Sequence, residues 1–336
     1  MKSYPYLCIF VAATTLAASS APAQTQSLNE PWSIEKPTLS VPKKVEVPAP
    51  DKERLLTSDP EEKTIDGATM VLEFNPDDLK SLLERGSALL RKRRIEESLA
   101  DFDHALTIDS NQADAHAGRG LALARLGKHD QACQSLTEAL ILRPDDAVLL
   151  YNRGVAFTFL KRDRDAVADF SKAIKIDDRD AESFYNRGMA WKRLGENNNA
   201  LLDFSRTVDL APGDVDALYN RGLSHFHSGR FNEAITDFTR VVSMQSDHSA
   251  AFFNRGVAHA KLGDLDAAIA DYTTALSINP KDPDAFLNRA NAHRQKRETA
   301  AAISNYEAFI QNAPAGYETY VDQAKRRLAE LKGAEK

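Results

Sequence analysis

A glycine recurs every 34 residues along most of the chain, and this period constrains the fold more than any other feature. Each glycine follows an arginine, and a small side chain stands twelve residues after it. The period is kept by six glycines, with Ala290 in the seventh place: Gly86, Gly120, Gly154, Gly188, Gly222 and Gly256. Seven copies of one unit predict a repeat architecture in which neighbouring units cover one another.

Within each unit the apolar residues follow a helical period. In residues 181–214, Phe184 and Gly188 share one face of a first helix, while Ala200 and Phe204 line a second helix. Two helices cross closely only where the facing side chains are small, so the Gly and Ala positions indicate helix packing. The pattern predicts an all-α fold built of helix pairs.

The motif of a known repeat family stands in this unit at Phe184, Arg187, Gly188, Trp191, Ala200, Phe204 and Pro212. The chain therefore resembles a tetratricopeptide-repeat (TPR) protein. The resemblance implies a right-handed superhelical solenoid of seven helix-turn-helix repeats, at 79–112, 113–146, 147–180, 181–214, 215–248, 249–282 and 283–316. Residues 317–336 stay in phase without a partner helix, and we interpret them as a capping helix and tail.

Arginine stands before each glycine, where the family commonly has leucine. Aspartate recurs sixteen residues after five of these arginines. We predict ion pairs or hydrogen bonds across each helix pair, and we interpret this ladder as architectural rather than ligand-binding. The predicted pairs join Arg85, Arg153, Arg187, Arg221 and Arg255 to Asp101, Asp169, Asp203, Asp237 and Asp271 respectively.

The N-terminus resembles an export signal. Residues 1–23 hold Lys2, an apolar run over 7–18 and a small-x-small site at 21–23, which predicts a cleaved signal peptide. An uncleaved anchor is the alternative. We expect an exported protein, with the periplasm favoured over secretion or N-terminal anchoring.

An acidic, proline-rich segment follows at 24–78. It holds seven of the 14 prolines, and six Lys and Arg against twelve Asp and Glu. This composition predicts a disordered linker, with a docking peptide as the alternative. Residues 72–76 resemble a helix end and are interpreted as a helical N-cap segment.

The sequence holds no phosphate-binding loop, zinc-protease motif or nucleophile elbow. His225, His259 and His293 share the 34-residue period, but equivalent positions in adjacent repeats lie on the order of 10 Å apart, too far to share a metal ion. Cys133 falls at a core position and is predicted to be a buried thiol. We therefore expect no enzyme, cofactor, metal or small-molecule substrate.

The net charge of −6 argues against nucleic-acid binding. After signal cleavage no apolar run approaches the length of a membrane span.

In TPR proteins the first helices line a concave groove where protein or peptide partners bind. Matching positions give Tyr151, Asn152, Tyr185, Asn186, Arg193, Tyr219, Asn220, Phe253, Asn254, Lys261 and Asn288. Asparagine amides can bond a peptide backbone, and the basic residues would favour acidic ligands. The alternative is that Tyr and Asn only pack.

The resemblance thus implies a non-catalytic interaction scaffold in the bacterial envelope. The alternative is an accessory subunit of an envelope enzyme or assembly machine, docked through its convex surface.

Overall fold

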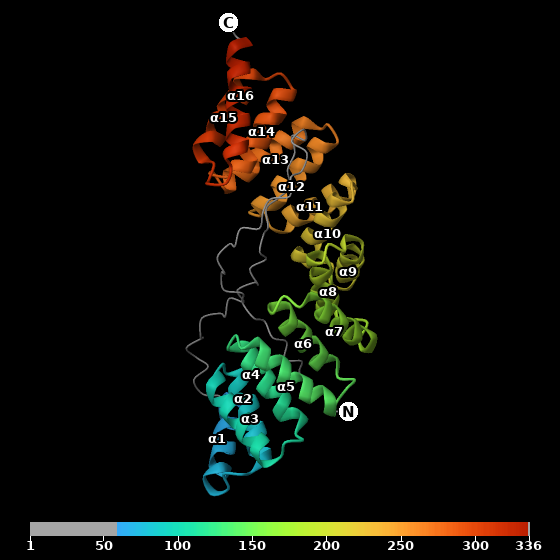
Figure 1. The fold of residues 1–336 in the computed structure, drawn as a ribbon, viewed down its shortest axis with the longest axis vertical. Helices are drawn as coiled ribbons and strands as arrows, with labels where there is room; N and C mark the ends of the chain where they lie inside the picture. Colours follow the sequence, from blue (N-terminus) through green and yellow to red (C-terminus); the bar gives the residue numbers. More distant parts are fainter. Residues whose placement is uncertain (1–58, 335–336) are drawn as a thin grey trace. The chain divides into compact units, whose positions relative to one another are not determined.

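The computed structural model describes residues 59–334, which form sixteen α-helices and no strand (Figure 1). These residues divide into two compact units, 59–206 and 207–334, and each unit is described by itself. The predicted signal peptide and residues 24–58 of the predicted linker lie outside the described residues.

The helices of the first unit are α1 (Pro60–Phe74), α2 (Leu79–Arg91), α3 (Ile95–Ile108), α4 (Ala113–Arg125), α5 (His129–Leu142), α6 (Ala147–Phe159), α7 (Asp163–Ile176) and α8 (Ala181–Arg193). Helix α9 (Asn197–Leu210) spans the boundary between the units. The second unit contains α10 (Val215–His227), α11 (Phe231–Met244), α12 (Ser249–Lys261), α13 (Leu265–Ile278), α14 (Pro283–Gln295), α15 (Thr299–Asn312) and α16 (Glu318–Ala334).

Helices α2 to α15 are the seven predicted helix-turn-helix repeats, and the all-α repeat fold is confirmed. Each first helix begins 34 residues after the previous one, at 79, 113, 147, 181, 215, 249 and 283. Aspartates start several of them: Asp78 accepts from the Ser81 amide at 2.9 Å, and Asp214 from the Ala217 amide at 2.9 Å. These caps satisfy amides that have no partner inside the helix.

The close helix crossing that the small residues predict is present in each described pair. A Cβ atom on Gly154 would lie 2.7 Å from the Phe170 ring, which has no exposed surface. At Gly118 a Cβ would lie only 2.2 Å from the ring of Phe102, which belongs to the preceding repeat. In five of the seven repeats the aromatic side chain of the second helix therefore packs into space that glycine leaves open, and in α5 Leu136 does so at Gly120.

Helix α16 acts as the predicted C-terminal cap. Ala324 has no exposed surface, and it packs with the buried Tyr306 and Phe309 of α15. Leu328 and Leu331 border the same cluster.

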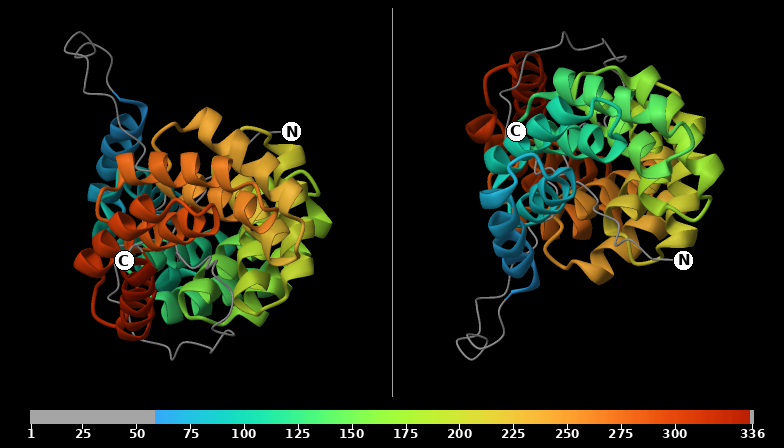
Figure 2. Two further views of the ribbon diagram at one scale, coloured as in Figure 1. Left: turned by 90° about the horizontal axis from the view of Figure 1, so that it is seen from above. Right: turned by 90° about the horizontal axis from the view of Figure 1, so that it is seen from below.

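The disordered linker predicted over 24–78 is wrong at its C-terminal end. Residues 60–74 form helix α1, which packs against α2 with Ile65, Ala68 and Leu72 buried (Figure 2). Lys92 pairs with Asp59 at 2.6 Å and Arg91 with Glu61 at 2.7 Å, so charges also hold α1 to the end of α2. The helical segment expected at 72–76 is the end of this longer helix.

The sequence motif does not identify helix α1, because this helix lacks the motif residues, although it keeps the repeat phase. It ends 34 residues before α3 ends, so it takes the place of a second helix, and no first helix precedes it among the described residues. Gly67 and Ala68 stand where α3 has Asp101 and Phe102. Among the described helices none combines the length and apolar character needed to cross a membrane.

Candidate functional site

The five arginine–aspartate pairs predicted from the 34-residue period are all present. Arg187 is representative: its Nε and Nη2 donate to the two carboxylate oxygens of Asp203 at 2.8 and 2.7 Å. Arg153 and Asp169 repeat this two-pronged geometry at 2.7 and 2.8 Å. The aspartates are buried and the arginines mostly so, which places the pairs between the helices rather than on an open surface.

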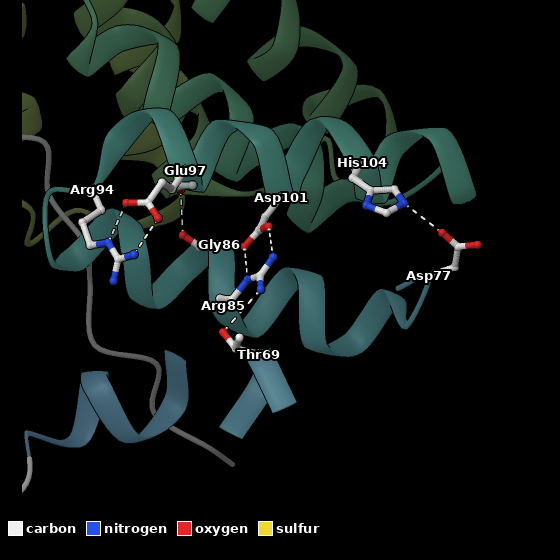
Figure 3. Close-up of polar contacts among 9 residues, drawn as sticks. Thr69, Asp77, Arg85, Gly86, Arg94, Glu97, Asp101 and His104 are labelled. Atoms are coloured by element: carbon white, nitrogen blue, oxygen red, sulfur yellow. Dashed lines mark hydrogen bonds and ion pairs between the residues drawn. The ribbon is translucent and has the colours of Figure 1, made fainter. Parts of the chain in front are cut away.

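Four of these five arginines have a second partner that was not predicted. The Nη1 of Arg187 donates to the Ser171 hydroxyl in the preceding repeat at 3.0 Å, and Arg255 does the same to Thr239 at 3.1 Å. Figure 3 shows the first case, in which Arg85 joins Asp101 to Thr69 of α1. The sequence signal for this second bond is a hydroxyl residue sixteen positions before the arginine. By bonding to this hydroxyl and to the aspartate, one arginine side chain links three helices.

Two arginines lack the aspartate and pair otherwise. Ser135 replaces it beside Arg119, which donates to Asp103 of the preceding repeat at 2.6 Å and to Ser135 at 2.7 Å. A cavity of about 310 Å³ lies here, lined also by His116. Arg289 donates instead to Asn305 at 2.7 Å.

The predicted asparagine row lies on the first helices, where it forms bonds between repeats. In the first unit, Asn186 donates to the Glu182 carbonyl at 3.0 Å and to the Tyr151 hydroxyl at 3.2 Å. In the second unit, Asn254 donates to the Tyr219 hydroxyl at 2.7 Å. A tyrosine of one repeat thus accepts from an asparagine of the next.

Most of the eleven residues predicted to bind a partner are not open to one. Seven are buried: Tyr151, Asn152, Tyr219, Asn220, Phe253, Asn254 and Asn288. The expectation that the asparagine amides bond a peptide backbone is corrected for Asn152, Asn220, Asn254 and Asn288, because these side chains are buried within the array. The accessible members are Tyr185, Asn186, Arg193 and Lys261.

Three of the buried asparagines keep an unpaired oxygen. The Oδ1 atoms of Asn152, Asn254 and Asn288 are shielded from solvent and have no hydrogen-bond partner among the described residues. Their Nδ2 atoms are occupied, for example by the Val148 carbonyl at 2.8 Å from Asn152.

An accessible group remains on α6 and α8 of the first unit, and it includes Phe159, which belongs to the same face as the predicted residues. Phe159 is 37% exposed and stacks on His129 with ring centroids 4.4 Å apart. Arg193 lies at the equivalent position one repeat later, where it pairs with Asp163 at 2.7 Å. We call Phe159, Tyr185, Asn186 and Arg193 the α6–α8 face. Phe159 is apolar at a position that is basic in most repeats, a signal that sequence reasoning could have weighted more.

A family model described as tetratricopeptide repeat matches residues 83–147, 117–181, 185–246, 219–283 and 266–317, well over half of the chain. The chain belongs to the TPR family. Its repeats are therefore of a type whose established use is protein–protein interaction.

Several solved structures of TPR proteins resemble this chain in fold. YrrB, a TPR protein with an unusual peptide-binding site, is 25% identical with a TM-score of 0.52, covering 59% of this chain and 99% of its own. The C-terminal part of a TPR protein from Cytophaga hutchinsonii is 14% identical with a TM-score of 0.61, covering 70% and 97%. A TPR protein from Parabacteroides merdae is 17% identical with a TM-score of 0.51, covering 76% and 98%. No curated protein sequence matches the chain.

The histidines that share the 34-residue period in this TPR protein lie beside acidic groups of their own repeats. His259 lies 3.5 Å from Asp264 and His293 lies 2.6 Å from Glu298, each within its own repeat. Over residues 59–334 no three histidine, cysteine or acidic side chains come together as metal ligands would. Cys133 is buried as expected, and burial raises the pKa of its thiol to about 11, which disfavours the reactive thiolate.

Proposed function

We propose that this TPR protein is a non-catalytic scaffold of the bacterial envelope that binds protein or peptide partners along its first helices. The observation that carries the proposal is the α6–α8 face, where an exposed aromatic ring, an amide and a cation lie on adjacent first helices. The likeness to YrrB supports peptide as the ligand class.

The α6–α8 face offers the three contacts that an extended peptide needs. The Oδ1 of Asn186 has no partner among the described residues and can accept a peptide N–H, while Nδ2 holds the side chain in place through Tyr151. Phe159 gives an apolar platform, and burial lowers the pKa of the stacked His129, so the platform stays uncharged at neutral pH. Arg193 favours an acidic residue in the ligand.

The test compares three versions of the protein as bait in envelope extract. They are the natural chain, the double variant Phe159→Ser/Asn186→Ala, and the control Ile141→Ser, which changes a more exposed apolar residue on a second helix. The partner captured by the natural chain is then titrated against each version. We expect at least a tenfold weaker affinity for the double variant and an unchanged affinity for the control.

Equal affinity of all three versions would move the site off the first helices and favour docking through the convex surface. A natural chain that captures nothing from any envelope fraction would contradict the scaffold itself.

The envelope location rests on the signal-like pattern of residues 1–23. N-terminal sequencing of the protein from a periplasmic fraction tests it. We expect a chain that begins at Gln24; recovery from the cytoplasm with Met1 intact would exclude export.

A further inference from the structure

Helix α1 carries an apolar stripe that no described residue covers. Met70, Val71 and Phe74 are 63%, 45% and 89% exposed, and with Gly67 they follow helical spacing along one face. In α3 the residue equivalent to Val71 is Ala105, which has no exposed surface because α2 packs on it. Val71 therefore stands where a first helix packs in a complete repeat. Met70 and Phe74 extend the apolar surface beside it, at positions whose α3 equivalents, His104 and Ile108, are also partly exposed.

The sequence just before α1 does not suit this place. In repeat phase the missing first helix would span residues 45–57, which contain Pro48 and Pro50. Proline in a helix interior removes a hydrogen bond and clashes with the preceding turn. Lys52 also stands at the crossing position, where complete repeats have Gly or Ala.

The C-terminal end of the array is equally unsuited to cover this stripe. Helix α16 takes the place of a first helix, and no second helix follows it among the described residues. Arg326 stands where the seven first helices have Ala or Ser, and the first of these, Ala88, has no exposed surface. A head-to-tail joint that continued the repeats would bury this guanidinium without a partner, which is strongly unfavourable. Lys325 and Glu330 beside it are exposed, as expected of a polar cap.

We propose that α1 is a self-association surface, on which the stripes of two copies pack antiparallel about a two-fold axis. The stripe is self-complementary, because a Cβ at Gly67 would meet nothing within 4 Å and Met70 lies one turn away to fill that space in the other copy. The same register brings Lys63 of one helix beside Glu73 of the other. Neither has an ion-pair partner among the described residues, so the pairing adds complementary charge.

Of the other charges of α1, only Asp66 is exposed without an ion-pair partner among the described residues, and this charge weakens the contact. Glu61 and Asp59 are already engaged by Arg91 and Lys92 of the same chain. A contact of one helix with another is small by the standard of stable dimers, so we expect a dimer that forms with rising concentration.

Sedimentation velocity of the full chain over about 1 to 200 µM tests the proposal, a range set by the micromolar affinities typical of small interfaces. The weight-average mass should rise from the monomer value toward twice that value. In the variant Met70→Glu/Phe74→Glu it should stay at the monomer value. Both side chains are so exposed that glutamate there leaves the fold intact, which circular dichroism verifies. The matched control Met244→Glu changes a 46% exposed residue of α11 and should dimerise like the natural chain.

Three outcomes would overturn the proposal. They are a natural chain that stays monomeric throughout, a double variant that associates as the natural chain does, and a dimer that is lost on Tyr320→Glu in α16 instead. As a second measurement, Met70→Cys should give a disulfide-linked dimer on mild oxidation, because the pairing places the two copies of this position near the axis. Absence of that product from a dimeric sample would exclude the antiparallel register.

Discussion

The amide of Asn254 donates to the hydroxyl of Tyr219, 35 residues earlier, across a distance of 2.7 Å in the interior of the second unit. Asn186 and Tyr151 form the same bond in the first unit. A row of residues that could contact a ligand is thereby used to join successive repeats. Accessibility, rather than residue type, decides which members remain for a partner.

Removing the hydroxyl in Tyr219→Phe should lower the free energy of unfolding by about 1–3 kcal/mol, because the buried amide of Asn254 loses its acceptor. The oxygen of this amide already lacks a partner, so the side chain cannot compensate by turning over. Urea unfolding followed by circular dichroism measures the loss. Tyr320→Phe, at an exposed ring, is the control and should change nothing; a similarly silent Tyr219→Phe would show that the bond contributes little.

Arg187→Ala should destabilise the protein by about 3–5 kcal/mol, because it removes the two-pronged ion pair of the buried Asp203 carboxylate. Burial already raises the pKa of Asp203, against the lowering effect of Arg187. A carboxyl whose folded pKa lies above its unfolded value contributes stability at low pH and loses it as pH rises through the folded pKa. The deficit of the variant should therefore be larger at pH 8 than at pH 5. Thermal unfolding at both values is the measurement, and an unchanged Tm at pH 8 would contradict the architectural role.

Gly118→Ala should cost about 1–3 kcal/mol, because its Cβ would overlap the Phe102 ring. This cost opposes the gain of up to about 1 kcal/mol that alanine normally gives in a helix. Gly67→Ala is the comparison, since nothing lies within 4 Å of a Cβ there. Unfolding at low protein concentration should show the two substitutions moving stability in opposite directions. A shift of the same sign in both would count against the steric explanation.

His248→Asp should make the protein less sensitive to mild acid. His248 caps α12 by accepting the Ala251 amide on Nδ1 at 3.1 Å, which requires a neutral ring, and burial lowers its pKa. When the folded pKa of a base lies below its unfolded value of about 6.5, stability is full above that value and falls as pH drops toward the folded pKa. Aspartate occupies the equivalent position before α6, α8, α10 and α14. A carboxylate with the ordinary aspartate pKa of about 3.9 can accept the amide throughout this range. The Tm of the natural chain should fall from pH 7 to pH 5.5 more steeply than that of the variant; parallel curves would exclude His248 as a cause.

The repeat fold could be predicted almost completely because its helices share one motif. Gly154 and Phe170 stand at fixed positions, and their steric relationship recurs in four other repeats. Helix α1 could not be found this way, since Ala68 replaces the aromatic residue and only the phase remains. Its burial against α2 became visible from the packing of Ile65 and Leu72.

The sequence predicts which helix face carries the candidate site residues, but not which of these residues are buried. The period places Asn152 and Asn186 at equivalent positions, yet Asn152 is buried and Asn186 is accessible. This difference depends on which neighbouring side chains cover each amide, which is a property of the packed array. The exposure of Phe159 likewise depends on its stack with His129 in the preceding repeat.

Arg187 bonds to residues sixteen positions forward and sixteen positions back, and this symmetry has an evolutionary consequence. If residues 147–180 were excised, Arg187 would meet Thr137 in place of Ser171, and that threonine already accepts from Arg153. One hydroxyl would replace another, and Asp203 would be undisturbed. A gene encoding such an array can gain or lose whole repeats by unequal recombination while the arginine–hydroxyl bonds between neighbouring repeats are kept. The number of repeats is therefore free to follow the size of the partner.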